Sequence, residues 1–229
     1  MATSPALLSL NEILFHLSRA AAGAGAPVGI CEEFADTAAW LAFIDMDPAR
    51  AALPALDALA RTESSGDLVI RDNRVACRDG RTVSAIFAGP VVTDRLAMAP
   101  ADPMTLQVEE VDVPLLLAGA VAAAGSGHVR LSWRRGAETV IDVAGNMVAV
   151  KGDTTCGRAA VTVVANAPGA AVPSGVPLYA IDEGRQEALD HGIAADGAAW
   201  SGVLAYYGKT LVPSTERSRS EGAGPADGT

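Results

Sequence analysis

Hydrophobic and polar positions change their spacing twice along the chain. Through residues 9–65, apolar residues recur at three- and four-residue intervals, which is the spacing of one face of an α-helix. Through most of residues 66–166, apolar and polar residues alternate, as they do in strands with one buried face. Helical spacing returns in two short segments, at about 182–191 and 196–208. The sequence therefore predicts an α+β fold, with a largely antiparallel sheet over residues 66–166 covered by N-terminal and C-terminal helices.

The first segment contains residues that typically start and end helices. Ser9 and Glu12 form an S-x-x-E capping box, in which each side chain accepts a hydrogen bond from the other residue's backbone N–H. The glycines and the proline of 22–27 end this helix, and a second helix follows them. An aspartate and a proline at 47–48 predict the start of a third helix, which Pro54 is expected to kink or restart.

The alternating segment contains turn dipeptides and one apolar interruption. Asp-Asn at 72–73 and Asp-Gly at 79–80 predict tight turns in a β-meander over 66–93. The apolar run at 113–124 is shorter than the roughly 20 residues that a membrane-spanning helix needs, and we expect a buried helix there. Alternation resumes at 128–133, where the even-numbered positions are expected to face away from the core.

The chain is long enough to bury its own core, and it fits a single domain over residues 1–229. Its parts are a helical N-terminal part (1–65), a β-rich core with one buried helix (66–166), a loop with short helices (167–208) and a polar C-terminal arm (209–229). By composition alone, the arm is typical of a mobile chain end.

Charge and cysteine usage exclude several classes of partner. The chain has 17 Lys+Arg against 27 Asp+Glu, a formal net charge of −10. A field of this sign repels phosphate backbones and anionic membranes, so we expect neither a nucleic acid nor a membrane as partner. Cys31, Cys77 and Cys156 are widely spaced, which favours a reducing compartment over a disulfide framework or a zinc ribbon. The first residues lack the pattern of a signal peptide, and we expect a cytoplasmic protein.

The sequence contains none of the common catalytic motifs: no G-x-S-x-G, Walker loop, H-E-x-x-H or strand-linked G-x-G-x-x-G. Cys31 near a helix start has the position of a nucleophile, but Glu32 and Glu33 disfavour its thiolate, so a small buried residue is the favoured interpretation. The three histidines have no ligand spacing, and no metal site is predicted. The segment from Lys151 to Arg158 fits either an anion-binding nest or a hairpin turn, and the hairpin turn is favoured.

Two segments of the chain resemble a known family. They are "LSLNE…AAAGAG…G…EE……WL" at 8–41 and "TLVPSTERSRSEGAG" at 210–224. The matching positions are Ser9, Leu10, Asn11, Glu12, Gly23, Gly25, Gly29, Glu32, Glu33, Trp40, Leu41, Thr210, Pro213, Thr215, Glu216, Ser218, Arg219, Gly222 and Gly224. They are similar to the two ends of a bacterial family of uncharacterised proteins, domain of unknown function 3726. The resemblance implies no reaction, and Ala22 and the terminal "PADGT" depart from the family pattern, so this member could have an altered activity.

The resemblance implies that the two ends of the chain act together. Because the family pattern has polar residues of defined type at both ends, we expect the arm to fold back near the first two helices. A site could form there, although salt bridges that merely hold the arm explain the same residues equally well. Glu32 and Glu33 are also explained as helix-start acids that complement the helix dipole.

Two hypotheses follow for the function. The first is a cytoplasmic small-molecule enzyme or enzyme subunit acting on an anionic, carboxylate-type substrate, with no cofactor indicated. Its predicted catalytic residues are Asn11 and Glu33, and its predicted substrate-binding residues are Glu12, Glu32, Arg217 and Arg219. The second hypothesis is a non-catalytic accessory or oligomerising protein, whose arm docks on a protein partner or on a second copy of the chain.

Overall fold

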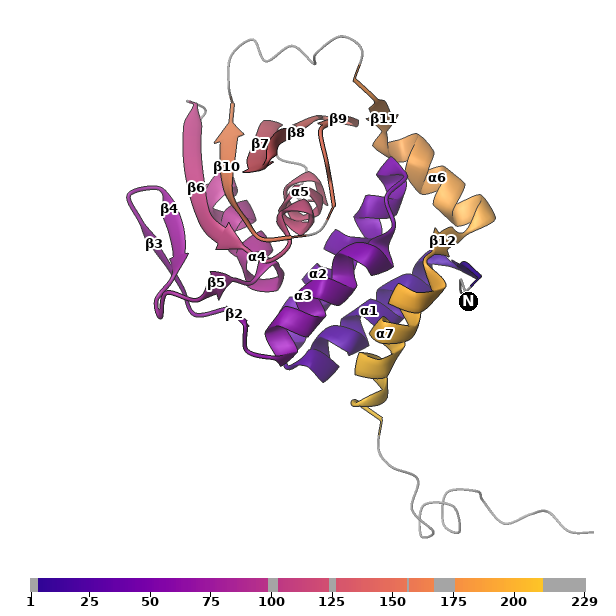
Figure 1. Cartoon of the computed structure of the whole chain (residues 1–229). Helices are drawn as coiled ribbons and strands as arrows, with labels where there is room; N and C mark the ends of the chain where they lie inside the picture. The colour runs from indigo at the N-terminus through magenta and orange to yellow at the C-terminus, as the bar shows by residue number, and fades with distance from the viewer. Residues whose placement is uncertain (1–3, 99–102, 124–126, 156, 167–175, 212–229) are drawn as a thin grey trace, which may run out of the picture.

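In the computed structural model, a curved mixed sheet carries most of the helices on one side (Figure 1). The structure describes residues 4–98, 103–123, 127–155, 157–166 and 176–211. Figure 1 shows α5, residues Pro114–Ala123, against the inner face of the sheet, with α1, α2, α3 and α7 beyond it. The predicted α+β fold class is confirmed.

The N-terminal helices are α1 (Leu10–Ala24), α2 (Val28–Trp40) and α3 (Pro48–Ala60), with a short 3-10 helix η1 (Leu41–Ile44) after α2. The predicted capping box is confirmed: Ser9 Oγ accepts the N–H of Glu12 at 3.2 Å, and Glu12 Oε2 accepts the N–H of Ser9 at 2.8 Å. Asp47 caps α3 as predicted, but α3 continues through Pro54 as one helix. Its buried, alanine-rich face packs on the core, which offsets the hydrogen bond that a proline removes.

The main sheet has the order β11-β9-β8-β7-β10-β6-β4-β3, with β2 and β5 beside this path. Its strands are β2 (Ser64–Ser65), β3 (Leu68–Arg71), β4 (Arg74–Cys77), β5 (Thr82–Val83), β6 (Met104–Val111), β7 (His128–Arg135), β8 (Ala137–Ala144), β9 (Met147–Lys151), β10 (Ala159–Ala165) and β11 (Leu178–Ala180). Three pairs are parallel: β2 with β5, β5 with β6, and β4 with β6. The prediction of a largely antiparallel sheet therefore holds only in part.

The register of the central strands aligns apolar residues on the face that α5 covers. Val163 of β10 pairs with Leu131 of β7 and with Leu106 of β6, and all three side chains are fully buried. On β7 the odd-numbered positions from 129 to 133 are buried and the even-numbered ones are partly exposed, as predicted. This row of side chains forms the centre of the core.

Residues 66–93 form only part of the predicted meander. β3 and β4 make a tight hairpin whose turn residues, Asp72 and Asn73, both have positive φ, at 48° and 58°. After the second predicted turn, β5 pairs in parallel with its neighbours, and residues Ala85–Ala97 form helix α4. The strand prediction is wrong there because a helix that is buried on most sides lacks a clear helical periodicity.

The apolar run at 113–124 forms α5 as predicted, and this helix contacts α2, α4, β7 and β10. Gly119 permits the close approach to α2, because an added Cβ would lie 2.5 Å from the carbonyl oxygen of Thr37. Among the described residues, no helix combines the length and apolar character needed to cross a membrane.

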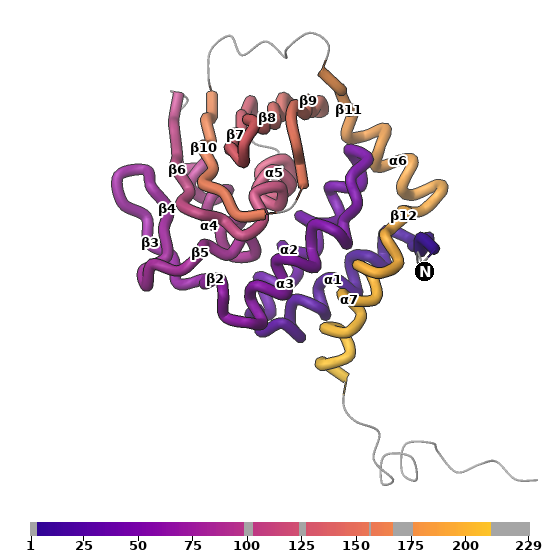
Figure 2. Tube along the Cα trace, in the orientation of Figure 1, coloured from indigo at the N-terminus to yellow at the C-terminus, as the bar shows by residue number. Residues whose placement is uncertain are grey.

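The C-terminal elements return to the N-terminal helices. α6 (Ile181–His191) follows β11, and β12 (Ile193–Ala195) pairs with β1 (Ala6–Leu8) in a separate two-stranded sheet. α7 (Gly197–Gly208) then packs against α1 and α3 (Figure 2). α3 therefore lies between α7 on one side and α2 and α5 on the other.

Candidate functional site

Asp112 is a buried acid at the junction of a strand and a helix. It follows β6 and precedes α5, and its backbone N–H donates to the carbonyl of Val83 at the end of β5. Because β2, β5 and β6 run parallel, their carboxyl ends meet at one edge of the sheet. Ligands of open α/β sheets commonly bind at such an edge. Only 5% of Asp112 is exposed, and burying a carboxyl group costs free energy unless it is hydrogen-bonded, paired or protonated.

The two oxygens of the Asp112 carboxyl group have different surroundings. Oδ1 accepts the backbone N–H groups of Ala85 (2.8 Å), which begins α4, and Val113 (2.7 Å), which precedes α5. Oδ2 is buried and has no hydrogen-bond partner among the described residues. The buried Ser64 hydroxyl makes no hydrogen bond of normal geometry either, but it lies close enough to this carboxyl group to lower its pKa, and the buried Ser84 hydroxyl has no partner among the described residues. One oxygen thus accepts hydrogen bonds from the starts of two helices, and the other remains open to the Ser64 hydroxyl, a ligand or a water molecule.

Burial also changes the acidity of this group. Burial raises the pKa of Asp112 from 3.8 to about 6. Several neighbours lower this pKa by a smaller amount: the N–H groups of Ala85 and Val113, the Ser64 side chain and the charge of Arg158. A carboxyl group with a pKa of about 6 can both accept and donate a proton near neutral pH.

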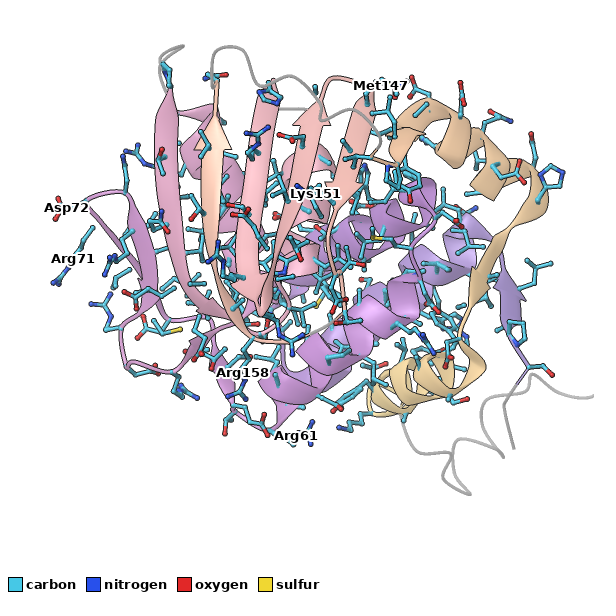
Figure 3. The ribbon with its side chains drawn as sticks, turned by 45° about the horizontal axis from the view of Figure 1, so that its top comes forward. Arg61, Arg71, Asp72, Met147, Lys151 and Arg158 are labelled. Carbon is cyan, nitrogen blue, oxygen red and sulfur yellow. The ribbon has the colours of Figure 1, made fainter. Side chains whose placement is uncertain are left out.

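A cavity of about 330 Å³ opens beside Asp112, between the second half of α3 and the residues before β10. Leu53, Pro54 and Ala58 form an apolar wall, and the charged lining side chains besides Asp112 are Asp57, Arg61, Glu63 and Arg158. Arg61 and Arg158 lie at the same edge of the molecule (Figure 3). The volume suits a small molecule.

Glu63 joins the two arginines of this cavity. Its Oε2 lies 2.9 Å from Arg158 Nη2, and its Oε1 lies 3.5 Å from Arg61 Nε. Arg61 Nη2 also lies 3.1 Å from Asp57 Oδ2, and the Tyr206 hydroxyl donates to Asp57 Oδ1 at 2.7 Å. Because these charged side chains are about half exposed, their ion pairs are weak and a competing charge can displace them.

Arg158 comes from the segment that links β9 to β10. The favoured sequence interpretation, a hairpin turn, is wrong, because β9 and β10 are not neighbours in the sheet. In the alternative, an anion-binding nest, the ligand would have to compete with the Asp153 carboxylate. This carboxylate already accepts hydrogen bonds from the N–H and the hydroxyl of Thr155, each at 2.9 Å. The Arg135 guanidinium packs on Gly157 and would have to move to admit a side chain there. The segment therefore works as a crossover that brings Arg158 to the side of α3.

The four predicted site residues that the structure describes lie in two separate pairs. Asn11 and Glu12 are exposed in the first turn of α1. Glu32 and Glu33 are exposed on α2, which begins just after the opposite end of α1. Glu32 lines a cavity with Arg19 and Ala22 of α1, which lie roughly 10 Å or more along the helix from Glu12. Glu32 and Glu33 also line separate cavities, of about 330 and 160 Å³. Their predicted catalytic and binding roles stay predictions.

The remaining sequence candidates add no second centre. Arg217 and Arg219 lie outside the described residues with the rest of the arm from residue 212, so docking of the arm stays a prediction. Cys31 is buried, and burial raises the pKa of its thiol, which favours the structural interpretation. In the part of the chain that the structure describes, no group of histidine, cysteine and acidic side chains could hold a metal ion.

Two other polar regions have simpler explanations. A larger cavity, about 610 Å³, lies among η1, β11 and α6 and is lined by Asp45 and Glu183, but no buried polar atom without a partner is found among its described lining. On the sheet, Arg130 donates to both oxygens of buried Asp142, at 2.8 and 3.0 Å. This pair satisfies its own carboxylate and fits a structural role. Asp112 is different, because it combines a cavity with an unsatisfied oxygen.

Sequence reasoning did not identify Asp112, although a signal was present. The stretch "VDVPLLL" at 111–117 places a single acid among apolar residues where a strand ends and a helix begins. Such an acid is buried only at a considerable free-energy cost unless it is paired or neutralised. Glu63 carried no comparable signal, because its role depends on arginines brought close by folding.

Solved structures share this fold. An E. coli protein whose name assigns it provisionally to the malate/lactate dehydrogenases has a TM-score of 0.58 and 9% identity, over 94% of this chain and 98% of that chain. A dehydrogenase from Sinorhizobium meliloti has a TM-score of 0.54 and 10% identity, over 89% of this chain and 100% of that chain. At such identities the likeness shows the fold alone. No curated protein matches the chain.

A family model matches the N-terminal part of the chain, residues 8–87. The match includes the first of the two segments in which the sequence resembles the family and ends before the second, whose resemblance stays a prediction. It covers Glu63 and Ser64 and ends before Asp112. Over residues 8–87, the chain is similar to the family described as "Protein of unknown function (DUF3726)".

Proposed function

We propose that this chain is a small-molecule enzyme that binds a carboxylate substrate in the cavity beside Asp112. The observation that carries the proposal is Asp112 Oδ2, a buried oxygen that makes no hydrogen bond of normal geometry with a described residue, on a carboxyl group with a pKa of about 6. Strongly perturbed acids that line cavities are typical of catalytic sites. Asp112 is the proposed general acid–base group.

Arg158 and Arg61 are the proposed binding groups for the substrate carboxylate. A planar guanidinium group donates two parallel hydrogen bonds to a carboxylate, which fixes both the position and the orientation of the ligand. Both arginines line the same cavity as Asp112. The carboxylate would lie at the exposed rim, and the reacting part of the molecule would extend toward the buried acid.

Asp112 is held in one orientation for proton transfer. In its ionised form, Oδ2 accepts a proton from the substrate, and in its protonated form it donates one. Oδ1 keeps its hydrogen bonds from Ala85 and Val113 in both forms, so the carboxyl group does not need to rotate. This arrangement separates a structural oxygen from a reactive one.

The similar structures support this class of function. The name of the E. coli protein refers to malate and lactate, which are small carboxylates with a hydroxyl group. The S. meliloti protein is named a dehydrogenase. These names agree with a small-molecule enzyme, and the cavity residues supply the specific form of the proposal.

Isothermal titration calorimetry with acetate, lactate, malate and succinate tests the proposal. We expect at least one acid to bind the wild-type chain and Arg158→Ala to weaken its binding by about 10- to 100-fold, the effect of losing a charge-assisted hydrogen bond. Arg74→Ala is the matched control, because Arg74 pairs with Glu109 at 3.3 Å outside the cavity lining. Failure of all four acids to bind, or equal binding by Arg158→Ala, overturns the proposal.

A further inference from the structure

Glu63 lies where a substrate carboxylate would lie. Its two oxygens bridge Arg158 Nη2, at 2.9 Å, and Arg61 Nε, at 3.5 Å, at the rim of the cavity. These two arginines are the cationic side chains among the described cavity lining. A carboxylate of the protein itself therefore neutralises the groups that an anionic ligand needs.

We propose that Glu63 is an internal competitor, which a substrate carboxylate displaces from Arg158 and Arg61 and which returns when the product leaves. This inference rests on the proposed function of the Asp112 cavity. It gives Glu63 a role in affinity and ligand selection, and none in proton transfer.

The Glu63 side chain can leave the arginines while its backbone stays in place. The side chain is 44% exposed, so water can receive its carboxylate. The backbone is anchored to the end of α3, because Glu63 N donates to Ala58 O at 2.8 Å and Thr62 N donates to Leu59 O at 2.9 Å. Thr62 is in the left-handed region, with φ of 56°, which turns the chain sharply after the helix. Rotation of one side chain is therefore enough to open the rim.

The two arginines respond differently when Glu63 leaves. Arg61 stays in place, because Asp57 pairs with its Nη2 at 3.1 Å and accepts its Nε–H on the main-chain carbonyl at 3.3 Å. Arg158 makes its only ion pair among the described residues with Glu63, so its guanidinium group becomes available. An incoming carboxylate restores that pair and can extend its other atoms toward Asp112.

The exchange also selects for charge. Replacing one carboxylate by another leaves the charge of the rim unchanged. A neutral ligand that displaced Glu63 would leave Arg158 without a counter-charge. The loss of this ion pair disfavours the binding of neutral ligands. We therefore expect the cavity to prefer carboxylates over the matching amides.

Glu63→Gln tests the competition, because glutamine keeps the shape of the side chain and removes its charge. Glu63 makes two exposed ion pairs, which together weaken ligand binding by a factor of about 2 to 20. Glu63→Gln should therefore bind the acids of the calorimetric panel more tightly by that factor. Glu63→Ala should show the same direction. Glu109→Gln is the matched control: it removes the acid of an exposed arginine pair outside the cavity lining and should bind like the wild type.

Phenylglyoxal modification, read by mass spectrometry, reports the bridge independently of ligand binding. Arg158 should react faster in Glu63→Gln than in the wild type, and at the wild-type rate in Glu109→Gln. An unchanged rate at Arg158, or equal or weaker acid binding by both Glu63 variants, overturns the inference. If the wild type still binds an acid through Arg158, the proposed function survives that result; if no protein binds any acid, both proposals fail.

Discussion

Replacing Asp112 with asparagine keeps the shape of the buried group and removes its charge. The amide oxygen can accept the same N–H groups, from Ala85 and Val113, that Oδ1 accepts in the wild type. The amide nitrogen takes the place of Oδ2, which has no partner among the described residues. Asp112→Asn therefore isolates the free energy of holding a negative charge at this position.

The raised pKa fixes the sign and the size of the expected effect. Asp112 ionises at about 3.8 in the unfolded chain and at about 6 in the folded protein. The folded protein therefore binds this proton more tightly, and the contribution of Asp112 to the free energy of unfolding falls as the pH rises from about 4 to about 6. Above that window the charge destabilises the fold by about 3 kcal/mol, and well below 3.8 the effect is absent.

Urea denaturation of the wild type and Asp112→Asn at pH 4 and pH 8, followed by tryptophan fluorescence, measures the effect. The difference in free energy of unfolding should shift in favour of the variant by roughly 2–3 kcal/mol between the two pH values. Glu109→Gln, which removes an exposed carboxylate, should follow the wild-type pH dependence. A difference between Asp112→Asn and the wild type that does not change with pH would refute the reasoning.

Two further predictions concern packing and support. Gly119→Ala should destabilise the protein by about 1–3 kcal/mol in urea denaturation, because the new Cβ would lie 2.5 Å from Thr37 O. Gly29→Ala, where no atom lies within 4 Å of the new Cβ, should be neutral or slightly stabilising. Equal effects of the two substitutions would contradict the close approach. Tyr206→Phe should lower stability by about 1–2 kcal/mol, because it removes the 2.7 Å hydrogen bond to Asp57, and an unchanged midpoint in the same assay would show that this bond contributes nothing.

Features set by neighbouring residues could be predicted from the sequence. The capping box of Ser9 and Glu12, the Asp47 cap and the turn at 72–73 all depend on contacts within a few residues, and all three are present. The buried helix at 113–124 followed from its continuous apolar run. Local chemistry determines these elements, so a single sequence is enough to place them.

The candidate site could not be predicted, because its parts come from distant segments. Asp112, Ala85, Glu63 and Arg158 belong to four different stretches of the chain, which the parallel pairing of β2, β5 and β6 and the antiparallel pairing of β10 with β6 bring together. Sequence reasoning considered Arg158 only as part of a local turn or nest. The helical state of residues 85–97 was missed for a related reason, since burial by distant elements removes the periodicity that marks a helix.

The central claim is that Asp112 is a high-pKa acid beside a carboxylate-binding arginine. Its most direct test is a 13C NMR titration of the Asp112 carboxyl carbon, with and without saturating malate. We predict a pKa of about 6 in the free protein and a higher one with malate, because one malate carboxylate replaces Glu63 at Arg158 while the second brings a further negative charge toward Asp112. A pKa near 3.8 that malate does not change would contradict the claim.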